Sequence, residues 1–146
     1  MKRFSDWQLW AALAVALPVW GIAYLWFRPP IILGWPLNHP LLALKLVLFF
    51  PLAEEIVFRG LIQDFLHTHL KHQWGYLSAA NLLTSLLFAA LHLINHAPAW
   101  ALLVIFPSLV FGYFRERHET LLTPVGLHIF YNAGYFLLLA PPSALL

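Results

Sequence analysis

The chain has 146 residues, of which 62% are hydrophobic and only 10% are charged. A soluble domain has about 25% charged residues, so this composition excludes an ordinary soluble protein and predicts one integral membrane domain over residues 1–146. The formal net charge of +2 gives no indication of a nucleic-acid partner, and the absence of cysteine excludes disulfides, thiolate metal sites and a cysteine nucleophile.

Five hydrophobic segments follow one another, and each approaches the roughly 20 residues that a membrane-spanning helix needs. We therefore predict an all-α fold, a polytopic transmembrane bundle of about five helices with a buried active site. The segments are residues 7–27, 40–66, 76–94, 98–114 and 121–139.

The first segment follows Met1-Lys2-Arg3, so a cleaved signal peptide is the alternative to a retained helix. We favour the retained helix because the apolar stretch is long, contains Trp10, Trp20 and Trp26, and lacks a clear cleavage site of small residues. Residues 1–40 are thus expected to form an N-terminal transmembrane helix and an interfacial loop.

Basic residues predict the orientation of the chain. They occur before the first segment, after the second and after the fourth, at Lys2, Arg3, Lys71, Arg115 and Arg117. These positions share one side of the membrane if all five segments span it, and loops rich in basic residues face the cytoplasm. We expect a bacterial or archaeal cell-membrane protein with its N-terminus in the cytoplasm and its C-terminus outside.

The second segment contains three charged residues, Glu54, Glu55 and Arg59, in an apolar run. One charged side chain at the middle of a membrane costs about 2.5–3.5 kcal/mol on insertion scales, so we expect these residues to have a function. Glu55 precedes Arg59 by four residues, the order that favours a same-face ion pair. Glu54 is rotated by about 100° from Glu55 on a helix, so we assign Glu54 to the chemistry.

The third segment has polar side chains along one face. Asn81, Thr84 and Ser85 are typical of a seam where membrane helices hydrogen-bond to one another. Phe88 and His92 continue the same face by steps of three and four residues. Such an interface between helices accounts for Asn81, Thr84 and Ser85 better than for His92.

The fifth segment carries His128 and Asn132, again four residues apart on one helical face. A lone histidine in a membrane helix is usually an interhelical hydrogen-bonding residue. Together with Glu54 and His92, however, these residues provide two imidazoles, a carboxylate and a carboxamide. Such groups can activate water and stabilise an oxyanion.

Three short motifs occur in order on successive hydrophobic segments: Glu-Glu-x-x-x-Arg from Glu54 to Arg59, Phe-x-x-x-His from Phe88 to His92, and His-x-x-x-Asn from His128 to Asn132. In this order they resemble the CPBP family of intramembrane proteases, named for CAAX processing and bacteriocin processing. The family includes the type II CAAX prenyl endopeptidases and is also called the abortive-infection family. The similarity covers about residues 41–139, which would form the catalytic core.

The resemblance implies an intramembrane endopeptidase that hydrolyses a peptide bond of a membrane-anchored substrate, in CAAX-type or C-terminal sorting-signal processing. It implies that Glu54 and His92 activate water, and that His128 and Asn132 stabilise the oxyanion. The supporting residues would be Glu55, Arg59 and Phe88.

A metal is an open question at this site. Members of the family are often labelled metalloproteases, while a metal-independent, glutamate-type mechanism is also held for them. Glu54, His92 and His128 could form a zinc site of two histidines and one carboxylate. Neutral imidazoles suit both mechanisms, and we favour no obligatory metal, with zinc as the alternative.

The partners expected are the lipid bilayer and a membrane-anchored protein or peptide substrate. Family members commonly have more than five helices, so an oligomer or a partner could complete this core. The alternative function is a non-catalytic membrane protein, such as a bacteriocin-immunity or partner-binding subunit, whose polar groups only hold helices together. A proton-coupled transporter is a third hypothesis, which five helices without a detectable repeat disfavour.

Overall fold

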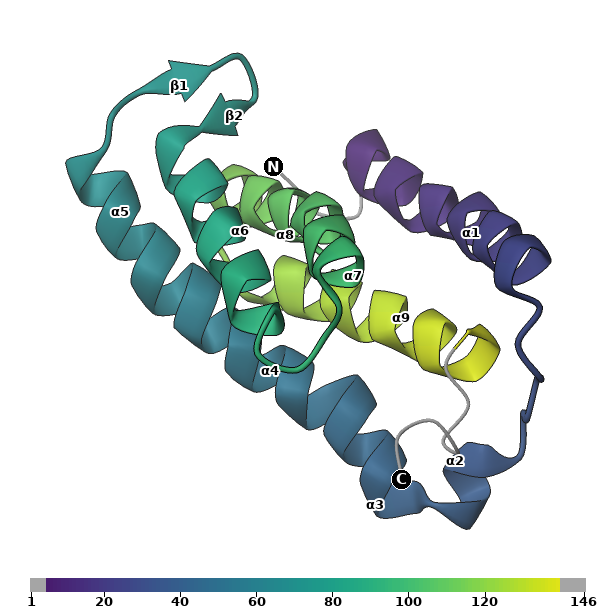
Figure 1. The fold of residues 1–146 in the computed structure, drawn as a ribbon. Coiled ribbons are helices and arrows are strands. Elements are labelled where there is room, and N and C mark those ends of the chain that lie inside the picture. The colour runs from purple at the N-terminus through teal and green to yellow at the C-terminus, as the bar shows by residue number, and fades with distance from the viewer. Residues whose placement is uncertain (1–4, 140–146) are drawn as a thin grey trace. The chain divides into compact units, whose positions relative to one another are not determined.

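The computed structural model describes residues 5–139 and is nearly all-α (Figure 1). Lys2 and Arg3, which contribute to the predicted orientation, lie outside the described residues. The elements in chain order are α1 (Trp7–Phe27), α2 (Trp35–Asn38), α3 (Pro40–Leu44), η2 (Lys45–Phe49), α4 (Phe50–Glu55), η3 (Ile56–Gln63), α5 (Asp64–His69), β1 (Gln73–Trp74), β2 (Leu77–Ser78), α6 (Ala79–His92), α7 (Pro98–Leu103), α8 (Ile105–His118) and α9 (Leu122–Leu138).

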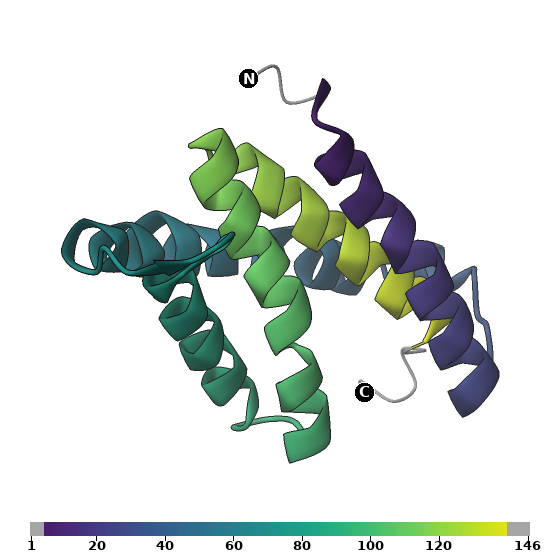
Figure 2. The same ribbon diagram turned by 90° about the horizontal axis from the view of Figure 1, so that it is seen from above.

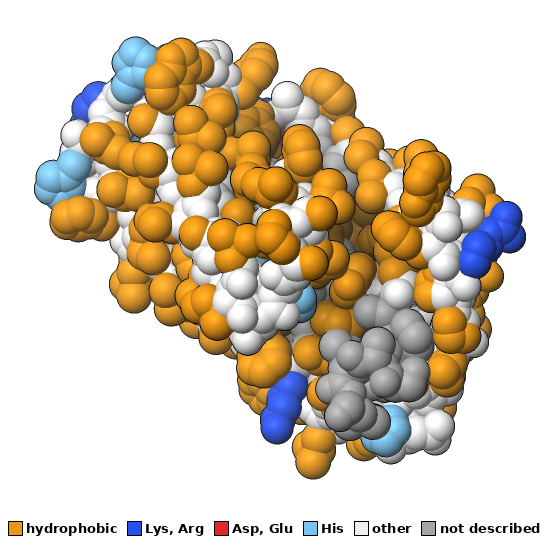
Figure 3. All heavy atoms as spheres, viewed as in Figure 1, with side chains coloured by type: hydrophobic (Ala, Val, Ile, Leu, Met, Phe, Trp, Pro, Cys, Tyr) orange, Lys and Arg blue, Asp and Glu red, His pale blue; other side chains and the backbone are white. Residues whose placement is uncertain are grey.

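Two helical stretches of the described chain are long and apolar enough to cross a membrane, namely α1 and the run Pro98–His118 that contains α7 and α8. Both expose large apolar side chains, among them Trp26 at 81% and Phe106 at 67%. Hydrophobic side chains cover most of the face shown in Figure 3. Apolar surface of this extent is typical of contact with a membrane. The helical fold is confirmed, and the bundle of five spanning helices stays a prediction.

The second predicted segment alternates between α-helix and π-helix from Pro40 to His69. Its two π-helical parts are η2, with five residues, and η3, with eight. π-Helical turns are rare and often occur at functional sites. The longer one, η3, begins immediately after Glu54 and Glu55, so the backbone departs from α-helical geometry next to the carboxylates.

The chain divides into two compact units, Met1–Leu52 with Gly126–Leu146 and Ala53–Val125. In the first unit, α9 is held to α1 and α2 by hydrogen bonds. A tyrosine hydroxyl of α9 donates to the Ala12 carbonyl oxygen at 2.9 Å, and the indole of Trp35 donates to the Phe136 carbonyl oxygen at 3.1 Å. The Trp20 ring also packs on an α9 phenylalanine, with ring centroids 5.1 Å apart.

In the second unit, α6 and α8 lie side by side (Figure 2). The Asn81 side chain donates to the Leu109 carbonyl oxygen at 3.0 Å and accepts from the Ser85 hydroxyl at 3.2 Å. The predicted helix seam is therefore confirmed for Asn81, whereas the Ser85 hydroxyl bonds to Asn81 within α6. Gln63 of η3 joins the same seam by donating to the Gly112 carbonyl oxygen at 3.0 Å.

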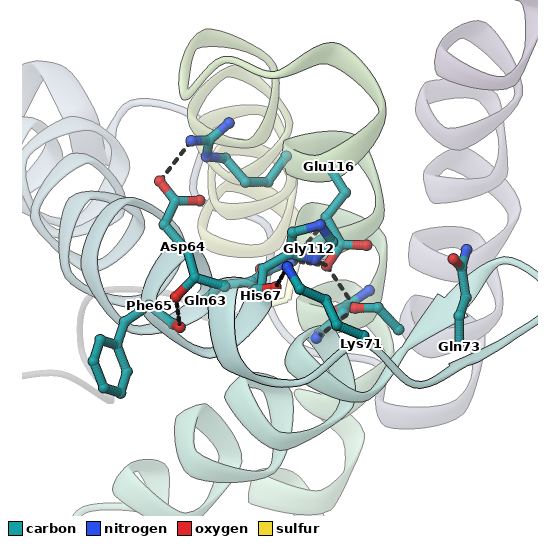
Figure 4. Close-up of polar contacts among 12 residues, drawn as sticks. Gln63, Asp64, Phe65, His67, Lys71, Gln73, Gly112 and Glu116 are labelled. Carbon is teal, nitrogen blue, oxygen red and sulfur yellow. Dashed lines mark hydrogen bonds and ion pairs between the residues drawn. The ribbon is translucent and has the colours of Figure 1, made fainter.

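A polar network joins η3, α5, α8 and β2 at one end of this unit (Figure 4). One carboxylate oxygen of Glu116 accepts hydrogen bonds from Gln63 at 2.7 Å and from Ser78 at 2.6 Å. Arg115 pairs with Asp64 at 2.6 Å beside them. These contacts fix the junction between η3 and α5. They thereby hold the helical stretch that carries Glu54 and Glu55.

Candidate functional site

The ion pair predicted in the second segment is present and completely buried. Arg59 Nη1 lies 3.1 Å from Glu55 Oε1, and neither side chain has exposed surface. The other terminal nitrogen, Nη2, donates to the backbone oxygen of Ser108 at 2.9 Å and to its hydroxyl oxygen at 2.7 Å. Arg59 thus connects the π-helical segment η3 to α8, which supports the structural role expected for the pair.

Two aromatic rings flank the Arg59 guanidinium. Its central carbon lies 4.9 Å from the centroid of the Phe88 ring and 5.4 Å from that of Phe111. Cation–π attraction of this kind offsets part of the cost of burying the charge. Phe88, which was expected as a supporting residue, therefore packs directly on the buried ion pair.

Glu54 and Glu55 have different surroundings although they are neighbours at the end of α4. Glu55 is fully buried, whereas Glu54 is half-buried. The ion pair thus encloses one carboxylate, and the other keeps a surface that substrate or water can approach.

His92 is the last residue of α6, and its imidazole is held by its own helix. The ring nitrogen Nδ1 lies 2.8 Å from the backbone oxygen of Phe88. A carbonyl oxygen only accepts hydrogen bonds, so Nδ1 carries the proton in this contact, and in the neutral ring Nε2 keeps its lone pair. Nε2 can therefore accept a hydrogen bond from water or bind a metal ion.

Sequence reasoning missed the aromatic stack that continues beyond His92. The ring centroids of His92 and His96 are 5.9 Å apart, and those of His96 and Trp100 are 4.1 Å apart. Partial burial, together with the nearby His92, lowers the pKa of His96 below its usual value, which favours the neutral ring. The available signal was the spacing, because Phe88, His92, His96 and Trp100 recur every four residues.

His128 and Asn132 lie one turn apart on α9, in the other unit. His128 is buried, with 6% of its surface exposed, and Asn132 is half-buried. The amide nitrogen of Asn132 donates to the Leu46 carbonyl oxygen of η2 at 3.0 Å. This contact orients the amide, and an amide nitrogen has a second hydrogen that can be donated to a ligand.

The seven predicted site residues are divided between the units. Ala53–Val125 contains Glu54, Glu55, Arg59, Phe88 and His92, and the other unit contains His128 and Asn132. Within either unit, residues 5–139 contain no group of three histidine or acidic side chains that could hold a metal ion. The zinc ligands considered from the sequence come from both units. Of these, His92 has an Nε2 lone pair that could bind a metal ion.

Sequence reasoning also missed Ser108 and Gln63, although the spacing of both residues in the sequence is informative. Gln63 follows Arg59 by four residues, and Ser108 precedes Gly112 by four residues in an apolar helix. Such spacing places small or polar residues on one helical face, where membrane helices approach each other. The spacing alone does not name the partner helix, which the structure identifies.

Comparison with known proteins identifies one family. The model of this family, type II CAAX prenyl endopeptidase Rce1-like, matches residues 35–134, which are 100 of the 146 residues and include all three motifs. Neither the comparison with curated proteins nor that with solved structures found a match. The resemblance inferred from the motifs is thereby confirmed.

Proposed function

Because the chain belongs to the Rce1-like family of type II CAAX prenyl endopeptidases, which are membrane proteases, we propose that it is an intramembrane endopeptidase. Its substrate is a membrane-anchored protein or peptide, processed in CAAX-type or C-terminal sorting-signal cleavage. The five hydrophobic segments form its transmembrane bundle, with the N-terminus in the cytoplasm and the C-terminus outside.

The contrast between Glu54 and Glu55 is the observation that supports this proposal best. A protease of the glutamate type needs a carboxylate that can take a proton from water. Glu55 binds Arg59 in a buried pair, while Glu54 is half-buried directly beside that pair. The resemblance of the motifs to the family implies the same catalytic residue.

The proposed reaction uses one water molecule and four side chains. His92 Nε2 accepts a hydrogen bond from the water, and Glu54 takes a proton from it as its oxygen attacks the peptide carbonyl carbon. His128 and Asn132 donate hydrogen bonds to the oxyanion that forms. The C–N bond then breaks, and the proton held by Glu54 passes to the leaving amine.

We also propose that no metal is obligatory for this reaction. If zinc binds, Glu54, His92 and His128 would hold it, and it would supply Lewis-acid polarisation of the peptide carbonyl. Purified, active protein should contain well under one zinc per chain by mass spectrometry and should keep its activity in a strong chelator. A stoichiometric metal whose loss abolishes cleavage would establish the metal-dependent alternative.

The test is cleavage of prenylated CAAX-type peptides and of peptides with a C-terminal membrane anchor, by protein reconstituted in bilayers. We expect Glu54→Gln, His92→Ala and His128→Ala each to abolish cleavage while the helical content stays unchanged. Matched exposed variants, Glu119→Gln and His72→Ala, should cleave like the wild type. Retained cleavage in Glu54→Gln would exclude the proposed mechanism.

A non-catalytic scaffold is the second candidate function. The observation that favours it is that several polar side chains of the described helices, including Gln63, Asn81 and Asn132, form contacts between helical elements. In a scaffold, the substitutions of Glu54, His92 and His128 would impair folding to a similar degree. No candidate peptide would be cleaved by the wild type.

A further inference from the structure

The ring of His92 packs against aromatic side chains from two directions. The Phe88 ring lies on one side, with centroids 4.5 Å apart. His96 and Trp100 contact it as well, at centroid distances of 5.9 and 5.7 Å and interplanar angles of 21° and 31°. All four residues belong to the same compact unit.

The backbone places Trp100 firmly next to this ring. Pro98 begins α7, a position where its fixed φ suits the first helical turn. The Trp100 amide donates to the Ala97 carbonyl oxygen at 3.0 Å, and the following Ala101 is 1% exposed. The short helix is therefore anchored on its buried face, and its tryptophan lies against the end of α6.

The turn between α6 and α7 fixes His96 in the same way. The His96 amide donates to the His92 carbonyl oxygen at 3.0 Å, and the Asn95 amide donates to the same oxygen at 3.3 Å. His96 thus lies one helical turn beyond His92, although α6 ends at His92. His96 and Trp100 form the closest pair of the stack, with centroids 4.1 Å apart.

His92 is the last residue of α6. Its Nδ1–H contact with Phe88 is a single hydrogen bond, and rotation about the side-chain bonds would break it and redirect Nε2. The neighbouring rings of Phe88, His96 and Trp100 restrict that rotation.

We propose that Trp100, with His96 stacked on it, is a positioning residue that holds His92 in the Nδ1–H tautomer with Nε2 directed at the reacting water. This inference rests on the proposed function, because it assigns Trp100 a role through His92. Trp100 itself touches neither substrate nor water in this role.

The first test compares Trp100→Ala, Trp100→Phe and the exposed α7 control Leu102→Ala in reconstituted bilayers. A displacement of about 1 Å in a reacting group can cost about 100-fold in rate, so Trp100→Ala should lower kcat by about 10- to 100-fold. KM should change by less than about twofold, because substrate contacts are unaffected. Trp100→Phe should restore most of the lost kcat, and Leu102→Ala should match the wild type.

The second test separates stacking from proton transfer at His96. His96→Phe keeps an aromatic ring and removes both ring nitrogens, so it should retain kcat, whereas His96→Ala should lower it. Loss of activity in His96→Phe equal to that in His96→Ala would overturn the stacking role. Wild-type kcat in folded Trp100→Ala, or failure of Trp100→Phe to recover activity, would overturn the proposal as well.

The third test does not depend on activity. Nitrogen-15 NMR of the imidazoles should show one protonated and one unprotonated nitrogen for His92 in the wild type, and signals averaged between tautomers in Trp100→Ala. Identical His92 signals in both proteins would overturn the positioning role. A wild type that cleaves none of the peptides, yet shows this spectral change, would refute the proposed function and leave the ring positioning supported.

Discussion

Positions 54 and 55 carry identical side chains in different surroundings, and this difference is the main result at the scale of single residues. The carboxylate of Glu55 is enclosed with Arg59 and has no exposed surface. Helical rotation of about 100° per residue places the Glu54 side chain elsewhere, where it is half-buried. The pairing of Glu55 with Arg59 could be predicted from their spacing. The hydrogen bond from Arg59 to Ser108 could not, because Ser108 lies 49 residues away from Arg59 in the sequence.

Substitution of Glu55 should affect stability in a way that depends on Arg59. Glu55→Gln leaves a buried arginine uncompensated, which typically costs about 3–5 kcal/mol. The double variant Glu55→Leu with Arg59→Met removes both charges and should recover most of that loss, because a buried pair is often replaced by apolar residues without penalty. Reversible unfolding in detergent measures both. Additive losses in the double variant would contradict the pairing.

Two buried hydroxyls offer a matched comparison. The Ser108 hydroxyl accepts a hydrogen bond from Arg59, and such bonds to charged groups contribute about 1.5–3 kcal/mol. The Thr84 hydroxyl is also buried but has no hydrogen-bond partner among residues 5–139. Ser108→Ala should therefore lower the unfolding free energy by roughly this amount, and Thr84→Val should leave it unchanged or raise it. Equal losses in both variants would contradict this assignment.

At the scale of elements, the approach of α6 to α8 depends on a glycine. A side chain added at Gly112 would collide with the Asn81 side-chain oxygen and would lie 2.9 Å from that of Gln63. Both amides are held by hydrogen bonds to α8, so neither can move away cheaply. Small residues at helix interfaces allow this close approach in membranes.

Alanine substitution of two helical glycines should have opposite effects. Overpacking of a filled interface costs about 1–3 kcal/mol, which we expect for Gly112→Ala. Gly126 of α9 has nothing within 4 Å of an added methyl group, so Gly126→Ala should gain up to about 1 kcal/mol from helix propensity. Thermal unfolding of the two variants beside the wild type measures both. Stabilisation by Gly112→Ala would contradict the observed seam.

The molecule consists of two compact units, and the predicted site residues are divided between them. The fifth segment returns to the unit that contains the first, so chain-distant residues such as Leu46 and Asn132 are joined by a hydrogen bond at 3.0 Å. Because the chain contains no cysteine, a single introduced thiol reports its own position without background.

We expect the two connections of α6 to lie on opposite sides of the membrane. Gln73→Cys, in the hairpin before α6, should be labelled by an impermeant thiol reagent only from the cytoplasmic side. Asn95→Cys, in the turn after α6, should be labelled only from outside. Both positions are exposed, so labelling in whole cells and in inverted vesicles compares them directly. Labelling of both from one side would show that the third segment does not span.

The sequence alone was sufficient for the helical membrane fold, the family and the Glu55–Arg59 pair. Composition, the length of a hydrophobic segment and four-residue spacing are local properties. Each can be determined from one stretch of the sequence. The tertiary structure decided that Ser108 completes the pair and that Trp100 contacts His92, because these contacts depend on how separate helices pack. It also showed π-helical turns in the second segment, since hydrophobic periodicity does not distinguish an α-helical turn from one containing an extra residue.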